Sequence, residues 1–212
     1  MMKTLDSVEP LRLNRGYLAI RPAHEREAAK IAALWSDAAR WLDGRGYDQW
    51  QYPPNMSRIH DSIVHGTAYI AEMEDGVVGT ITLDGAADPE FWHANDFPLS
   101  ALYIHRMIVS EVARGRQVGS SMLDWASARA ERAGVKFVRL DAWKRNYALQ
   151  DYYRSNGFTH VRTIDLPHRN SGALFQREAG TFLNAGPSVV DLEFPTHTAS
   201  GAPIEGRRGA IY

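Results

Sequence analysis

The chain has 212 residues, of which 44% are hydrophobic and 23% are charged, and this globular composition excludes wholesale disorder. The formal net charge of -1 gives no electrostatic reason to expect nucleic acid or an anionic membrane as a partner. The chain contains no cysteine, which excludes disulfides, thiolate metal sites and a cysteinyl acyl-enzyme.

Targeting and membrane segments are not evident in the sequence. No stretch approaches the roughly 18 to 20 apolar residues that a membrane span needs. The N-terminal residues lack the apolar stretch of a secretory signal. We therefore expect a cytoplasmic protein.

The first half of the chain contains both helix and strand patterns. From Glu25 to Leu42, apolar residues recur every three or four positions, which is the spacing of one helix face. Asp75 and Gly76 suit the tight turn of a hairpin. The predicted elements are a strand over 17–20, helices over 25–42 and 56–64, and hairpin strands over 67–73 and 77–83.

The second half continues the alternation after a polar insertion over 84–100. Its predicted elements are strands over 101–109, 135–143, 158–164 and 171–176, and helices over 118–133 and 146–155. Because one hairpin precedes two strand–helix–strand crossovers, we expect an α/β fold with a mixed sheet and helices on both faces.

The C-terminal part of the chain has a different composition. After Glu178 it is rich in Gly, Pro, Thr and Ala, with one apolar island at Val189–Phe194. This island would add a strand either to its own sheet or to another subunit.

The segment between the strand over 101–109 and the helix over 118–133 is the most informative motif. It is a basic, glycine-containing loop that opens a helix: Arg114-Gly115-Arg116-Gln117-Val118-Gly119-Ser120. Unpaired backbone N–H groups and the helix dipole favour a phosphate or pyrophosphate there. The alternative is an ordinary helix start with solvated arginines. P-loop and dinucleotide fingerprints do not fit, because their glycine and lysine spacing is absent.

Two segments of the chain resemble the GCN5-related N-acetyltransferase (GNAT) family. Arg114 to Gly119 is similar to its acyl-CoA loop, Gln/Arg-x-x-Gly-x-Gly/Ala, with Gln117 where the family usually has glycine. Asn146 to Phe158 resembles the family's helix and turn, with Tyr153 at the family spacing. The resemblance spans about 17–177 and implies a mixed sheet splayed between its fourth and fifth strands, with acetyl-CoA in the gap.

The resemblance also implies how the donor is held. The backbone of residues 107–109 would bond the pantetheine arm and polarise the thioester carbonyl, while residues 114–120 would hold the pyrophosphate. The Gln117 side chain would either crowd that pyrophosphate or give it an amide donor. The implied cofactor-binding residues are Met107, Ile108, Val109, Arg114, Gly115, Arg116, Gln117, Val118, Gly119, Ser120, Asn146 and Tyr153.

Tyr153 is the candidate general acid. It would protonate the departing CoA thiolate, because a phenol is neutral at pH 7 and can donate a proton. Its neighbour Tyr152 is expected to belong to the core. Asn146 opens the same helix, so it is expected to cap that helix as well as to touch the cofactor.

His105 is the candidate general base, because an ammonium has no lone pair and an imidazole titrates in the right pH range. A period-two pleat would put Tyr103, His105 and Met107 on one face of the strand, with Arg106 on the other face as a structural residue. The alternative for His105 is a buried histidine with a purely structural role.

The acceptor pocket is expected between the first two helices, their loop and the far end of the strand over 135–143. Its candidate residues are Trp41, Gln49, Trp50, Tyr103 and Trp143, with Tyr47, Tyr52 and Tyr147 beside them. An aromatic wall with one amide predicts a small, partly apolar amine held by cation–π contact. Alternatively, Trp41 and Trp50 fasten the helix to the sheet.

The resulting hypothesis is an N-acetyltransferase that moves acetyl directly from acetyl-CoA to the primary amine of a small molecule. Two alternatives stay open: a peptide or protein acceptor, and a non-catalytic acyl-CoA-binding module. We expect the catalytic domain over 1–177 and an extension over 178–212. That extension would pack on the domain or on a second subunit, as in a homodimer.

Overall fold

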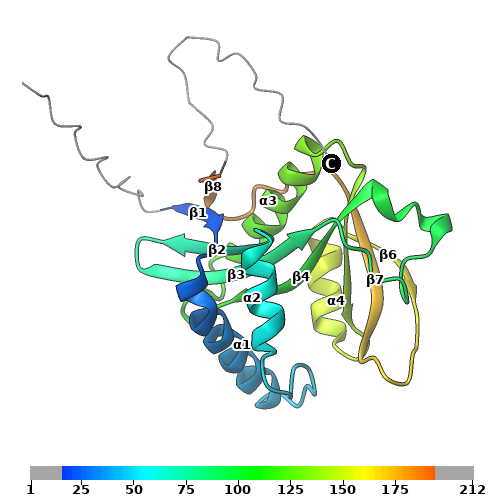
Figure 1. The fold of residues 1–212 in the computed structure, drawn as a ribbon, viewed down its shortest axis with the longest axis horizontal. Coiled ribbons are helices and arrows are strands. Elements are labelled where there is room, and N and C mark those ends of the chain that lie inside the picture. Colours follow the sequence, from blue (N-terminus) through cyan, green and yellow to red (C-terminus); the bar gives the residue numbers. More distant parts are fainter. Residues whose placement is uncertain (1–15, 194–212) are drawn as a thin grey trace, which may run out of the picture.

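The computed structural model describes residues 16–193, which build a mixed sheet (Figure 1). Its strands are β1 (Tyr17–Pro22), β2 (Ala68–Met73), β3 (Gly76–Asp84), β4 (Ala101–Val109), β5 (Phe137–Trp143), β6 (Thr159–Thr163), β7 (Ser171–Glu178) and β8 (Ser188–Asp191). The helices are α1 (Ala28–Asp43), α2 (Met56–Val64), α3 (Val118–Arg132) and α4 (Tyr147–Ser155). None of these helices is long and apolar enough to cross a membrane.

The sheet has the order β6-β7-β5-β4-β3-β2-β1-β8 and contains both parallel and antiparallel pairs. β4 and β5 run parallel but pair over only three residues, from Ala101 with Phe137 to Tyr103 with Arg139. Beyond that point the two strands separate. The splay between the fourth and fifth strands is therefore confirmed, and the later half of β4 leaves its β5-facing edge without a strand partner.

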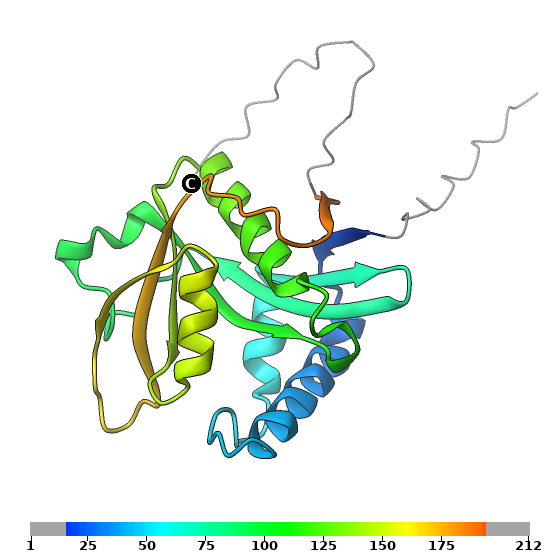
Figure 2. The same ribbon diagram turned by 180° about the vertical axis from the view of Figure 1, so that it is seen from behind.

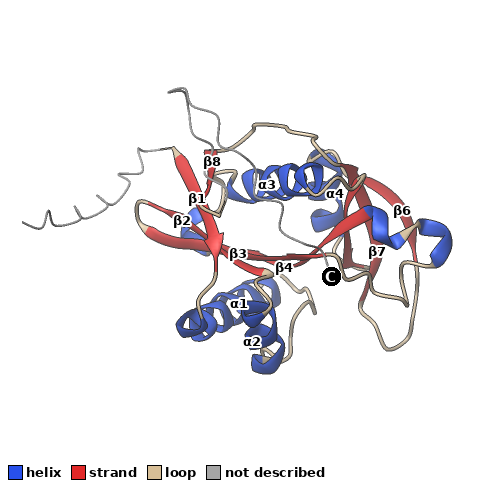
Figure 3. Cartoon of the chain, turned by 45° about the horizontal axis from the view of Figure 1, so that its top comes forward, coloured by secondary structure: helices blue, strands red, loops and turns tan. Residues whose placement is uncertain are grey.

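Helices cover both faces of the sheet, as predicted: α1 and α2 lie on one side, and α3 and α4 on the other (Figure 3). On the first side, Ile31 and Ile59 pack with Ile70 of the sheet. On the second side, Met122 of α3 packs with Val138 of β5 in a larger cluster. Each such buried side chain stabilises the fold by roughly 1.5–3 kcal/mol.

The segment after β7 crosses the outside of α3 before it forms β8 beside β1 (Figure 2). Asp124 of α3 accepts hydrogen bonds from the backbone N–H groups of Leu183 and Asn184, and Arg129 pairs with Asp191 at 2.8 Å. Of the apolar island Val189–Phe194, the part up to Asp191 adds a parallel strand to its own sheet, and Phe194 lies outside the described residues. The domain boundary near residue 177 stays a prediction.

Candidate active site

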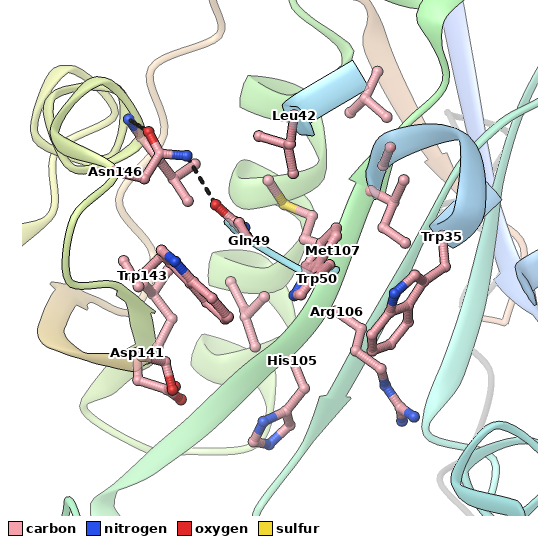
Figure 4. A pocket seen from close by; sticks show the side chains of 18 of the residues that line it. Trp35, Leu42, Gln49, Trp50, His105, Arg106, Met107, Asp141, Trp143 and Asn146 are labelled. Atoms are coloured by element: carbon pink, nitrogen blue, oxygen red, sulfur yellow. Dashed lines mark hydrogen bonds between the residues drawn. The ribbon is translucent and has the colours of Figure 1, made fainter. Parts of the chain in front are cut away.

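A cavity of about 1360 Å³ lies where β4 and β5 have separated (Figure 4). Its wall is formed by the later halves of both strands together with residues of α1, α2 and α4. Of the predicted acceptor residues, Trp41, Gln49, Trp50 and Trp143 line it, and so do Tyr47 and Tyr52. The splay thus creates the one space in which most of the candidate residues meet.

The loop between α1 and α2, residues 44–55, closes over this cavity and bonds to the far side of the splay. The indole N–H of Trp143 donates to the Asp48 carboxylate at 2.7 Å. The Asn146 amide donates to Gln49 at 2.8 Å (Figure 4), while its oxygen accepts from the N–H of Leu149 and caps α4. The cap that was predicted for Asn146 is confirmed, and its contact with a cofactor stays a prediction.

A bulge in β4 changes which side chains face the cavity. Along β3 the paired residues advance by two, from Thr80 to Thr82, while on β4 they change by three, from Ile108 to His105. Within this extra length lies Arg106, whose φ of 45° is in the left-handed region. A bulge breaks the regular alternation of a strand and re-aims its side chains.

Three predictions about β4 are therefore wrong. His105 and Arg106 both line the cavity, so Arg106 does not face away from it. Met107 packs toward the core on the α3 side and points away from His105 (Figure 4). Tyr103 does not reach the cavity: its ring packs on Trp92, and its hydroxyl donates to the carbonyl of Pro98 in the folded insertion.

Two carboxyl groups accompany His105. Its Nε2 lies 3.3 Å from the Asp84 carboxylate. Burial alone would raise the pKa of Asp84, but the hydrogen bond and the charge of His105 hold that pKa below its usual value. Asp141 lines the cavity from β5, where burial raises the pKa of its carboxyl despite a hydrogen bond from Ser171. His105 thus has a partner that can orient it and stabilise a positive charge on its ring.

Tyr153 lines the cavity from α4 and is 8% exposed. Its ring packs against Phe158 and Phe175, and its hydroxyl has no hydrogen-bond partner within residues 16–193. Burial raises the pKa of Tyr153 well above its ordinary value, so the phenol keeps its proton at neutral pH. A neutral, unpartnered O–H group in a cavity wall can donate a proton to a bound group.

Tyr152 is more than the core neighbour that was expected. It also lines the cavity, and burial raises its pKa to about 12. Its hydroxyl sits against the backbone of Gly119, where any Cβ would collide with that oxygen. Glycine at this position therefore allows α4 to approach the start of α3.

The start of α3 has the features of an anion site. Gly115 and Gln117 have positive φ values of 77° and 58°, and the N-cap residue Gln117 makes no side-chain capping bond. The first turn contains no acidic residue. Three buried atoms nearby, Ser110 Oγ, Arg114 Nη1 and Ser120 Oγ, have no hydrogen-bond partner among the described residues. Uncapped N–H groups with unpartnered donors around them fit a pyrophosphate.

Trp41 belongs to this anion-binding end. The guanidinium groups of Arg45 and Arg114 each lie 3.8 Å from the centre of its ring. Arg116, in contrast, is exposed and lies 3.7 Å from the Asp75 carboxylate. Trp41 therefore also holds a loop arginine, and its predicted role in acceptor binding stays a prediction.

Sequence reasoning missed several residues of the cavity wall: Trp35, Arg58, Asp84 and Asp141. Trp35 packs on Trp50 with ring centres 5.2 Å apart, which is the fastening role that was the alternative for Trp50. A signal for Asp141 was available, because it is a lone carboxylate in the apolar run Leu140–Trp143. Nothing local marked Arg58, which is an ordinary exposed position of an amphipathic helix.

Comparisons with known proteins agree with this architecture. Residues 64–160 match the family model of the acetyltransferase (GNAT) domain. The chain is 29% identical over 143 residues to the uncharacterized N-acetyltransferase YesJ of Bacillus subtilis, a match covering 65% of this chain and 79% of YesJ.

Solved structures also match. A GNAT-family acetyltransferase from Listeria monocytogenes is 26% identical, with a TM-score of 0.64 over 76% of this chain and 94% of that one. The PaiA N-acetyltransferase of Thermoplasma acidophilum, solved with coenzyme A, is similar in fold, with a TM-score of 0.58, 14% identity and coverage of 76% and 98%.

Proposed function

Because this chain belongs to the GNAT family of N-acetyltransferases, we propose that it transfers acetyl from acetyl-CoA to the primary amine of a small molecule. The observation that carries the proposal is the roofed cavity. It contains His105 and Tyr153 and reaches Arg114 of the anion loop. The expected homodimer and the cytoplasmic location stay predictions.

The donor would be held at the start of α3. The uncapped N–H groups of residues 117–120 would bind the pyrophosphate, and Arg114, steadied by Trp41, would add positive charge. The unpaired edge of β4 at residues 107–109 would bond the pantetheine arm. The PaiA N-acetyltransferase, which is similar in fold, was solved with coenzyme A, and this supports a CoA thioester as the donor. Bound there, acetyl-CoA supplies an activated thioester.

The chain's own groups would then move a proton from the acceptor ammonium, give a proton to the leaving thiolate and stabilise the developing oxyanion. His105, with Asp84 beside it, would take a proton from the acceptor ammonium, directly or through water, which frees the nitrogen lone pair. That nitrogen attacks the thioester carbonyl, and backbone N–H groups of β4 would stabilise the developing oxyanion. As the carbon–sulfur bond breaks, the Tyr153 O–H would give its proton to the leaving thiolate. The attacking nitrogen would lose its remaining extra proton through water, and that proton would restore the Tyr153 phenol.

The loop over the cavity, residues 44–55, favours a small molecule rather than a protein as the acceptor. Residues 48 and 49 bond across the splay to Trp143 and Asn146, so a folded protein would have to displace buried contacts to reach His105. A small amine would fit within the cavity of about 1360 Å³ without displacing that loop.

Thiol release from acetyl-CoA by the full-length chain, measured over a panel of small amines and peptides, tests the proposal. We expect release with small amines and none with peptides. Tyr153→Phe should lower kcat by about 100-fold or more while CoA affinity, measured by calorimetry, is kept. Tyr152→Phe, on the adjacent ring, is the matched control. Release with no amine, or an unchanged kcat in Tyr153→Phe, contradicts the proposal.

A further inference from the structure

The acceptor end of the cavity contains charged groups that the proposed acetyl transfer leaves unused. The proton transfers described above require His105, its partner Asp84 and Tyr153. Arg106, Arg58 and Asp141 line the same cavity and have no role in those steps. Partly buried charges are costly unless they are paired, so the partners of the half-buried Arg106 and Asp141 need an explanation.

Arg106 has no carboxylate partner within residues 16–193. Its one hydrogen bond is a 3.3 Å contact from Nη2 to the hydroxyl of Thr82. The nearest candidate carboxylate, Asp84, is bonded to His105 instead. Burial lowers the pKa of Arg106, and the positive charge of Arg58 lowers it further. Two guanidinium groups, one from β4 and one from α2, therefore line the cavity, and neither forms an ion pair with a carboxylate among residues 16–193.

The backbone at Arg106 supports a functional interpretation. A non-glycine residue at a positive φ is strained, and such strain clusters at active sites and ligand-binding sites. In a regular strand Arg106 would point away from His105. The bulge instead brings both side chains into one cavity.

Asp141 carries the complementary charge on the opposite wall. It stands on β5, across the splay from β4, and no basic side chain among the described residues forms an ion pair with it. Figure 4 shows His105 between Asp141 on one side and Arg106 on the other. The wall thus presents an unpaired carboxylate, a candidate base and an unpaired guanidinium in that order.

We propose that the acceptor is an amine that also carries a carboxylate, as amino acids do, with Arg106 and Arg58 binding the carboxylate and Asp141 facing the ammonium. This inference rests on the proposed acetyltransferase function and narrows its substrate class. A guanidinium presents a planar fork of N–H groups that matches the two oxygens of a carboxylate. The ligand would satisfy both charges, which explains why neither group forms an ion pair with another residue in the range 16–193.

The test compares L-amino acids with their carboxamides, which keep the amine and the side chain but lose the negative charge. We expect kcat/KM, followed by thiol release, to favour the amino acids by about tenfold or more. The ammonium of a carboxamide loses its proton more easily than that of an amino acid. This difference alone would favour the carboxamide, so it cannot produce the expected preference for amino acids. Arg106→Gln should reduce the preference to near unity, and Arg106→Lys, which keeps a cation, should retain part of it. Arg40→Gln, an exposed arginine on α1, is the matched control and should behave as the parent chain does.

Calorimetric titration of the same ligands separates this inference from the proposed function. If no amine releases thiol but amino acids bind more tightly than carboxamides, and Arg106→Gln removes the difference, the transferase proposal fails and the carboxylate site stands. If carboxamides are acetylated and bound as well as amino acids, the carboxylate site is refuted while the transferase proposal stands. Circular dichroism of each variant excludes misfolding as the cause of a lost preference.

Discussion

The side chain of Asn146 joins the two halves of the splayed sheet: its oxygen caps α4, and its nitrogen donates to Gln49 at 2.8 Å in the loop over the cavity. Both residues are buried. The position of the loop therefore depends on a hydrogen bond whose two partners lie 97 residues apart.

Removing either partner should lower the free energy of unfolding, by a different amount for each of the two residues. Gln49→Ala deletes only the bridge, and we expect a loss of about 1–2 kcal/mol in the free energy of unfolding, because a buried amide is left unpaired. Asn146→Ala also deletes the helix cap and should cost about 1 kcal/mol more. Urea unfolding measures both changes. Lys30→Ala, an exposed change on α1, is the control. A Gln49→Ala variant as stable as the parent would show that the bridge contributes nothing, and equal losses for the two variants would show that the cap contributes nothing.

The stacking of Arg114 on Trp41 predicts a donor-specific defect. Trp41→Ala should raise the KM for acetyl-CoA by about three- to thirtyfold, the range that a cation–π contact supports, with a smaller effect on the KM for the acceptor. Trp41→Phe keeps an aromatic face and should recover most of the affinity. Steady-state kinetics with each substrate varied in turn shows whether Trp41 acts at the donor end or at the acceptor end of the cavity. A defect confined to the acceptor would support the acceptor assignment of Trp41 instead.

Acid stability should depend on Glu27, which accepts two hydrogen bonds from Arg21. Those bonds lower the pKa of Glu27 to about 2 from a usual value of 4.5. Because the folded-state pKa is depressed, this stabilisation is present above about pH 4.5 and is lost as pH falls toward 2.

The variant Glu27→Gln should therefore be less stable than the parent at pH 7 by about 2 kcal/mol, and the gap should close between pH 4.5 and pH 2. Denaturant unfolding at several pH values measures this gap. Glu25→Gln, an exposed change in the same turn, should follow the parent curve. A gap that stays constant with pH would exclude the ion pair as its cause.

The pairing of Arg129 with Asp191 predicts that the segment after β7 unfolds in the same transition as the sheet and helices. Two hydrogen bonds of 2.8 and 2.9 Å join them, and the Trp125 indole also donates to Asp191. Asp191→Ala leaves a buried arginine with a lost partner and should cost about 3 kcal/mol. Asp37→Ala, which breaks an exposed pair on α1, should cost less than about 0.5 kcal/mol. A separate early transition in thermal unfolding would instead mark the segment as independent.

Local patterns predicted most elements of the fold. The strand over 101–109 and the helix over 56–64 have the predicted bounds, because apolar spacing and turn residues are properties of neighbours in sequence. The bulge at Arg106 was not predictable in this way, since it depends on the pairing of β4 with β3. Its absence from the prediction led to the wrong face for Arg106 and for Met107.

In the site, too, features that depend on neighbouring residues were predictable, and features that depend on distant contacts were not. The anion loop was identifiable because its glycines and arginines are contiguous, and the structure gives Gln117 the left-handed backbone that glycine adopts most easily. The contact of Trp41 with Arg114 was not predictable, because the two residues are distant in sequence. Whether His105 and Tyr153 transfer protons stays a prediction, although both line the cavity.

The pairing of β8 with β1 has a consequence for biosynthesis. β1, the first strand among the described residues, keeps one edge of its backbone unpaired until residues 188–191 have been translated, because β8 covers that edge. Unpaired strand edges template association between chains. The nascent protein is therefore most exposed to aggregation, and most in need of a chaperone, during the interval between synthesis of β1 and arrival of β8.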